Sequence, residues 1–185
     1  DASIATDFVD PYGICLYHDL DAGLLYVFAN DKDGRYRQWR LDPGPDDSIE
    51  STPVREFQLA SQPEGCVVDD STGVIYIGEE EHGVWRASAN PDADIDRTLV
   101  DMVQNGRLVA DVEGLALYRR DDQTLLFVSS QGDYSFAVYD VTEGRSAWLG
   151  SFRIADNESV DGPDAVSETD GLEVTERLVT ADYPS

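Results

Sequence analysis

The stretches DPYGICLY (10–17), SQPEGCVVD (61–69) and ADVEGLALY (110–118) repeat one pattern: a polar residue, a glycine and an apolar run. A second apolar run follows each of them, namely LLYVFANDK (24–32), VIYIGEEE (74–81) and LLFVSSQGD (125–133), and a fourth copy begins at TDGLEVT (169–175). The residue before each glycine is Tyr12, Glu64, Glu113 and Asp170, at intervals of 52, 49 and 57 residues. Repeats of roughly 40–50 residues built from short strands are typical of a β-propeller, with one repeat per four-stranded sheet, or blade.

Each complete repeat contains four segments rich in β-branched and aromatic residues, separated by clusters of Gly, Pro, Asp and Asn. The segments are 12–17, 24–30, 35–41 and 53–60, then 64–69, 74–79, 83–89 and 97–103, then 113–118, 125–130, 135–141 and 147–154. The sequence therefore predicts an all-β protein with three complete blades (approximately 10–60, 61–109 and 110–168) and a partial fourth (169–185). Because three blades and a fragment cannot close a ring, we expect further blades of the same propeller domain before residue 1 and after residue 185.

The charge balance is strongly acidic, with 38 Asp and Glu against 13 Lys and Arg, a net charge of −25, and Lys32 as the single lysine. Nucleic acid is a poor partner for such a chain, because neutralising phosphates requires clustered basic residues. An anionic membrane surface is a poor partner on the same ground, and no apolar run approaches the ~18 residues that span a bilayer. Two interpretations remain: a solvated surface suited to saline surroundings, or a supply of carboxylates for hard cations.

The two cysteines, Cys15 and Cys66, lie in the first predicted strands of the first two repeats but one residue out of phase. They should therefore point to opposite faces. Two buried thiols that act as small apolar side chains are the favoured interpretation, and a disulfide is the alternative. The cysteine count alone does not decide the redox compartment.

The polar positions of the repeats should meet at one face of the propeller. The first strand of a blade lines the central channel and the second runs back beside it, so the start of the first and the end of the second lie together. The residues gathered in this way are Tyr12, Glu64, Asp111, Glu113 and Asp170, with Lys32, Glu79, Glu80, Glu81 and Gln131. Two carboxylates about 5 Å apart repel by roughly 3 kcal/mol at an effective dielectric near 20, so such a cluster raises its pKa values or binds cations. Oxygen ligands without paired His or Cys favour Ca²⁺ over zinc or copper.

Lys32 stands at the end of a second strand and should face this acidic mouth. A metal site alone has no use for an ammonium group, whereas a phosphorylated substrate held between calcium ions and a cation does. The alternative is an ordinary turn lysine in NDKDG.

At this point the chain resembles a known family. The segments DPYGICLY, NDKDG, SQPEGCVVDD, YIGEEEHGVW, DVEGLALY, SSQGDYSFAVYD and the pair VDG…ETDG are similar, in order and over nearly the whole chain, to the alkaline β-propeller phytases. The resemblance implies a six-bladed propeller, of which this chain supplies the middle blades. It also implies calcium-dependent hydrolysis of phosphate monoesters from myo-inositol hexakisphosphate (phytate), with several Ca²⁺ ions and a metal-activated water as nucleophile.

The resemblance also implies roles for individual residues. Catalytic roles fall on Tyr12, Glu64, Asp111 and Glu113, substrate contacts on Lys32 and Gln131, and calcium ligation on Glu64, Glu80, Asp111, Glu113, Asp161 and Asp170. Segment 154–171 is longer than the corresponding family loop, so Asp161 and Asp164 compete for one role. The implied protein is a secreted bacterial enzyme, a monomer at full length, that takes phytate as its calcium complex. Because blades with further ligands are absent, these 185 residues alone should have little or no activity.

Two other functions remain open. One is a non-catalytic, calcium-stabilised propeller that serves as a binding or scaffold module, and the other is a calcium-dependent, lactonase-like hydrolase on a similar propeller. The fold alone does not separate them. Lys32 beside the carboxylates and Gln131 in SSQGD favour a phosphate ester.

Overall fold

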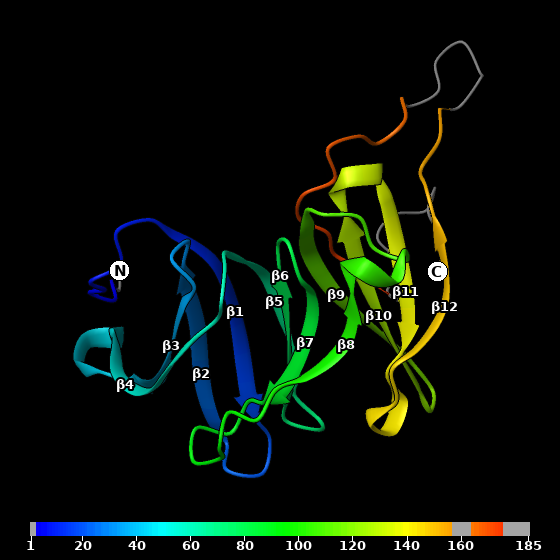
Figure 1. Cartoon of the computed structure of the whole chain (residues 1–185). Helices are drawn as coiled ribbons and strands as arrows, with labels where there is room; N and C mark the ends of the chain where they lie inside the picture. Colours follow the sequence, from blue (N-terminus) through cyan, green and yellow to red (C-terminus); the bar gives the residue numbers. More distant parts are fainter. Residues whose placement is uncertain (1–2, 157–163, 176–185) are drawn as a thin grey trace.

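The computed structural model describes residues 3–156 and 164–175, which form three four-stranded antiparallel sheets (Figure 1). Sheet 1 contains β1 (Pro11–Asp19), β2 (Leu24–Asp31), β3 (Arg35–Pro43) and β4 (Ile49–Gln58). Sheet 2 contains β5 (Pro63–Asp69), β6 (Val74–Glu79), β7 (Gly83–Ser88) and β8 (Thr98–Met102). Sheet 3 contains β9 (Val112–Arg120), β10 (Gln123–Ser130), β11 (Ser135–Asp140) and β12 (Ala147–Phe152).

In each sheet the strands lie in chain order, so every connection is a hairpin between neighbours. The helical elements of the described residues are the 3₁₀ turns η1 (Pro45–Asp47), η2 (Val103–Asn105), η3 (Gln131–Asp133) and η4 (Thr142–Gly144). None of these has the length or apolar character of a membrane-spanning helix. The prediction of an all-β chain with three complete four-stranded sheets is confirmed, and their arrangement is propeller-like. The six-blade count of the whole protein and the blade boundaries stay predictions.

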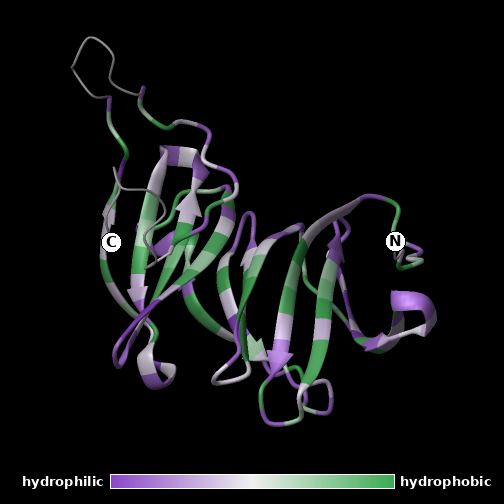
Figure 2. Ribbon diagram, turned by 180° about the vertical axis from the view of Figure 1, so that it is seen from behind, coloured by the Kyte–Doolittle hydropathy of each residue, from purple (hydrophilic) through white to green (hydrophobic). Residues whose placement is uncertain are grey.

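The sheets pack face to face, with one apolar core in each of the two interfaces. Tyr26 and Phe28 of sheet 1 meet Ile75 and Ile77 of sheet 2 in the first core. The second core joins sheets 2 and 3 through residues that include Tyr76, Val84, Leu126, Val128 and Tyr139. Apolar and polar residues alternate along the strands (Figure 2), as expected for strands that bury one face more deeply than the other. This packing places β1, β5 and β9 next to one another as the inner strands.

A disulfide between Cys15 and Cys66 joins the inner strands β1 and β5, with 5.7 Å between the two Cα atoms. The favoured expectation of two buried thiols was therefore wrong. The phase difference was read correctly, but it does not separate the two side chains. Where two successive sheets stack, one face of sheet 1 packs against the opposite face of sheet 2. Cysteines one residue out of phase consequently point toward each other across the interface.

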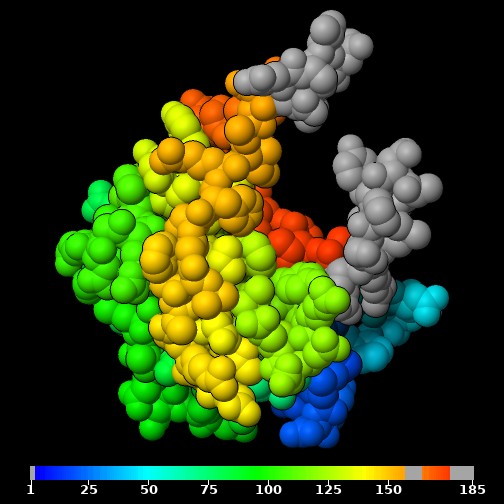
Figure 3. Space-filling model, turned by 90° about the vertical axis from the view of Figure 1, so that its right-hand side faces the viewer, coloured from blue at the N-terminus to red at the C-terminus, as the bar shows by residue number. Residues whose placement is uncertain are grey.

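Residues 169–175, the described part of the fourth copy, are not in a strand, and the blade expected to start there stays a prediction. This segment nevertheless lies against sheet 3: the Gly114 amide donates a 3.2 Å hydrogen bond to the Asp170 carbonyl. Figure 3 shows residues 164–175, in orange and red, at the surface beside this sheet. An inner strand of one sheet forms no ladder with the inner strand of the next, because each pairs with the second strand of its own sheet. A backbone hydrogen bond from Gly114 of β9 therefore positions this segment beside sheet 3.

Candidate functional site

The glycine of each of the three complete repeats packs directly against the backbone of the following repeat. A Cβ atom on Gly65 would lie 3.0 Å from the Glu113 carbonyl oxygen, and one on Gly114 would lie 2.6 Å from the Asp170 carbonyl oxygen. A Cβ atom at 2.6 Å would clash with the backbone and one at 3.0 Å would force it to shift, which explains why glycine follows the polar residue. Because of this close approach, the polar residues before the glycines follow one another along one rim. We call Tyr12, Glu64, Glu113 and Asp170 the rim residues.

A second recurring contact brings the loops after the second strands to the same rim. The residue after each second strand donates its amide to the carbonyl two positions before a rim residue. The three bonds are Lys32 to Asp10 (3.2 Å), Glu80 to Gln62 (3.1 Å) and Gln131 to Asp111 (2.8 Å). Lys32, Glu80 and Gln131 therefore occupy equivalent places in the three sheets. The structure brings together the expected residues Tyr12, Lys32, Glu64, Glu80, Asp111, Glu113, Gln131 and Asp170 at one end of the sheets.

The rim carboxylates act strongly on one another. Glu64 and Glu113 are only 1% and 6% exposed. Burial, a hydrogen bond with Glu64, and the negative charges of Glu64, Asp170 and Asp111 raise the pKa of Glu113 to about 8. Burial, followed by the charges of Asp111 and Glu64, also raises the pKa of Glu80. The rim is therefore short of positive charge, and it relieves the deficit by retaining a proton on Glu113.

Lys32 brings a positive charge to this rim, and it lies over the ring of Tyr12. The Lys32 ammonium lies 4.4 Å from the centroid of the Tyr12 ring, within the range of a cation–π contact. The negative charge of Glu64, then burial and the charge of Glu113, raise the pKa of Tyr12 to about 12, so its hydroxyl stays protonated. Many arginines of the described residues pair with carboxylates, but none of the ion pairs there includes Lys32.

The last residues of the second strands have a positioning role that the sequence did not reveal. Asp31, Glu79 and Ser130 accept the amide hydrogens of the chain that enters the neighbouring first strand. The bonds are Val9 to Asp31 (2.7 Å), Ser61 to Glu79 (2.8 Å) and Val109 to Ser130 (2.8 Å). The signal in the sequence that could have revealed this role is their position directly before the loops of the rim.

Glu79 corrects the expectation that three successive carboxylates, 79–81, share the mouth. It is 1% exposed, and its second carboxylate oxygen accepts a 2.6 Å hydrogen bond from Trp85 Nε1. The Glu79 side chain therefore belongs to the interior. Glu79 is the last residue of β6, whereas its neighbour Glu80 belongs to the loop that follows. Glu81 is exposed and acts on Glu80 through its charge.

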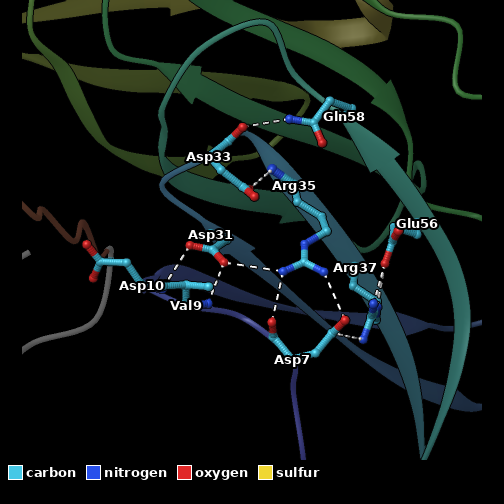
Figure 4. A network of polar contacts seen from close by, with 9 residues as sticks. All are labelled: Asp7, Val9, Asp10, Asp31, Asp33, Arg35, Arg37, Glu56 and Gln58. Carbon is cyan, nitrogen blue, oxygen red and sulfur yellow. Dashed lines mark hydrogen bonds and ion pairs between the residues drawn. The ribbon is translucent and has the colours of Figure 1, made fainter.

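A polar network fastens the segment that leads into Tyr12 (Figure 4). Asp31 accepts the amides of Val9 and Asp10 and also contacts Arg35 at 3.4 Å. Burial opposes ionisation of Asp31, but these hydrogen bonds outweigh it and hold its pKa below the usual value. Arg35 in turn binds Asp7 at 3.0 Å. The backbone next to Tyr12 and Lys32 is therefore fixed from the outer side.

The donor set of the rim suits a hard cation, since it is made of carboxylates, of which Glu64 and Glu113 are buried and deficient in counter-charge. Among the residues that the structure describes, however, no three His, Cys, Asp or Glu side chains are grouped closely enough to enclose an ion by themselves. Asp161, the remaining expected ligand, lies outside the described residues. Asp164 is described and exposed.

The chain is similar to known proteins over nearly its whole length. The family model described as Phytase matches residues 1–185. The chain is 35% identical over 182 residues to the 3-phytase of Bacillus subtilis (strain 168), an alignment that covers 98% of this chain and 47% of the relative. The chain thus spans about half the length of the curated relative it matches.

Proposed function

The chain belongs to the phytase family, and from this premise we propose that the whole protein hydrolyses phosphate monoesters of phytate with calcium ions bound at the rim. The observation that carries the proposal is the pairing of Lys32 with Tyr12 at a carboxylate rim. A rim built only to hold cations gains nothing from an ammonium group. A phosphate ester explains both charges, because its oxygens can bind the ammonium and the metal ions together.

The chain's own residues divide the work as follows. Lys32 binds a phosphate oxygen, and the ring of Tyr12 supports its ammonium group. Gln131 occupies the equivalent place in sheet 3 and offers a neutral amide to a further phosphate oxygen. Glu64, Glu80, Asp111, Glu113 and Asp170 would hold calcium, with Asp161 as a further candidate ligand.

Calcium, when bound, would supply the positive charge that offsets the phosphate and lowers the pKa of bound water. The raised pKa of Glu113 supports this assignment, because a carboxyl that keeps its proton for lack of counter-charge becomes a ligand when a cation replaces that proton.

The disulfide bears on where the protein works. Disulfides persist in oxidising surroundings and are rare in the cytoplasm, so Cys15–Cys66 supports export of this protein from the cell. We therefore propose a secreted phytase that acts as a monomer on the calcium complex of phytate.

The test is phosphate release from phytate by the full-length protein, with calcium and with a chelator. Lys32→Glu should abolish release while leaving calcium-induced thermal stabilisation intact. Arg120→Glu makes the same charge change at an exposed residue that ends β9, away from the rim, and should leave release unchanged. Calcium-dependent stabilisation without any release from the unmodified protein would instead indicate a calcium-stabilised binding module.

A further inference from the structure

Asn30 is a fully buried amide directly behind the rim, and it bonds to two sheets at once. Its Oδ1 accepts the Gly13 amide at 2.9 Å, and its Nδ2 donates to the Glu64 carbonyl oxygen at 3.0 Å. Gly13 follows Tyr12, and Glu64 is itself a rim residue. One side chain therefore connects the backbones of two neighbouring rim residues.

Each of the three seams between successive repeats is built differently at this position. Gly78 takes the place of Asn30 in sheet 2, where a Cβ would lie 3.0 Å from the Glu113 carbonyl, and the backbones simply pack. In sheet 3, Ser129 donates to the Thr169 carbonyl at 2.7 Å. Asn30 alone among the three both accepts from its own sheet and donates to the next rim residue.

We propose that Asn30 is a positioning residue that sets the spacing between the Tyr12–Lys32 pair and the Glu64 carboxylate. The inference rests on the proposed function, since it assigns the pair to substrate phosphate and Glu64 to the bound cation. Lys32 and Glu64 belong to different sheets, so any change in the seam between β1 and β5 alters the distance over which they share a substrate. Cys15–Cys66 fixes the same seam further along the strands, whereas Asn30 binds the Glu64 carbonyl itself.

Two substitutions separate the two bonds of Asn30. Asn30→Asp keeps an oxygen for the Gly13 amide but turns a carboxylate oxygen toward the Glu64 carbonyl, which replaces an attraction by a repulsion. Asn30→Leu has a similar shape and removes both bonds.

Gln38 on β3 offers a matched control. It is also fully buried, and its Nε2 donates at 2.8 Å to the carbonyl of Ala89 in the neighbouring sheet. Ala89 directly follows β7, at the end of that strand opposite the rim loops. Gln38→Glu and Gln38→Leu therefore break the same kind of inter-sheet bond away from the rim.

The measurement is steady-state phosphate release by the full-length variants. Each variant is assayed at the same number of degrees below its own thermal unfolding midpoint. Asn30→Asp and Asn30→Leu should lower kcat roughly ten- to hundredfold with little change in KM, because Lys32 remains while the reacting groups are misplaced. The Gln38 variants should keep kcat within about twofold of the unmodified protein. Equal losses of kcat in the two sets would overturn the proposal.

If neither Asn30 variant folds, Asn30→Ser can replace them, because it supplies the hydroxyl that Ser129 provides in sheet 3. A kcat of Asn30→Ser no lower than that of Gln38→Ser would count against the inference.

Hydrogen exchange of the Gly13 amide is a measurement that does not depend on the reaction. Exchange should accelerate in Asn30→Leu and stay unchanged in Gln38→Leu. An unmodified protein that releases no phosphate would refute the proposed function, and unchanged exchange at Gly13 would refute the positioning role separately.

Discussion

Reduction of Cys15–Cys66 should lower the free energy of unfolding by about 4 kcal/mol. The two cysteines are separated by 51 residues, so the bond closes a loop that contains all of sheet 1 after Cys15 and the start of β5. In the chain-entropy treatment, a loop of that length removes about 14 cal/mol/K from the unfolded state, which at 298 K is about 4 kcal/mol. The estimate applies to the unfolded chain and does not depend on the geometry of the bond.

Urea unfolding of the full-length protein, oxidised and fully reduced, measures this difference without changing any residue. The double variant Cys15→Ser/Cys66→Ser is the control, since reductant should have no effect on it. The variant itself should be at least as unstable as the reduced protein, because Cys66 is buried in the first core and serine is more polar. A reduction effect below about 1 kcal/mol would refute the reasoning. It would mean that the seam between β1 and β5 restricts the reduced chain as strongly as the bond does.

Three further predictions concern the rim. The pKa of Glu113 is raised from its ordinary 4.5 to about 8, so the folded protein keeps a proton that the unfolded chain loses. The free energy of unfolding should therefore be greatest below about pH 5 and fall as the pH rises through about 8. Urea unfolding in the presence of chelator should show this decrease with pH, and Glu113→Gln should remove it. Glu113→Gln should also lower calcium-dependent phosphate release at least about tenfold, and unchanged release would take Glu113 out of the calcium site. Gly114→Ala should destabilise the protein by about 1–3 kcal/mol, because the added Cβ meets the Asp170 carbonyl. The control is Gly171→Ala, whose Cβ meets nothing within 4 Å. It should change the free energy of unfolding, measured by heat or urea, by less than about 0.5 kcal/mol.

The strand pattern was predictable because the repeat fixes it several times over. The predicted segments coincide with β1 to β12 to within a few residues, since runs of alternating and β-branched residues end at Gly, Asp and Asn turns in every copy. The equivalence of Tyr12, Glu64 and Glu113 followed from the same repeat, because residues at one repeat position occupy one position in every sheet. The hydrogen bonds that place Lys32, Glu80 and Gln131 beside them confirm this equivalence in the described structure.

The features that escaped prediction depend on relations between sheets. The cysteines were assigned to opposite faces, which was correct for each strand but silent about which faces meet. Glu79 and Glu80 are adjacent in the sequence and of the same residue type. Because β6 ends between them, Glu79 lies in the interior and Glu80 belongs to the rim. Asn30 gave no signal, since an asparagine at the end of a strand is as compatible with a turn as with a bridge between two backbones.

The geometry of the glycines explains why the rim cannot relax its own repulsion. Glu64 and Glu113 are held by close backbone contacts: a Cβ atom on Gly65 would lie 3.0 Å from the Glu113 carbonyl oxygen and would force the backbone to shift. A pair of exposed glutamates would separate by turning their side chains into water, but these two are buried and share a hydrogen bond. The fold therefore fixes the carboxylates first and leaves only their charge to adjust, by a proton on Glu113 or by a cation. Such a rim destabilises the free protein at alkaline pH, and this cost is consistent with a site shaped by ligand binding instead of stability.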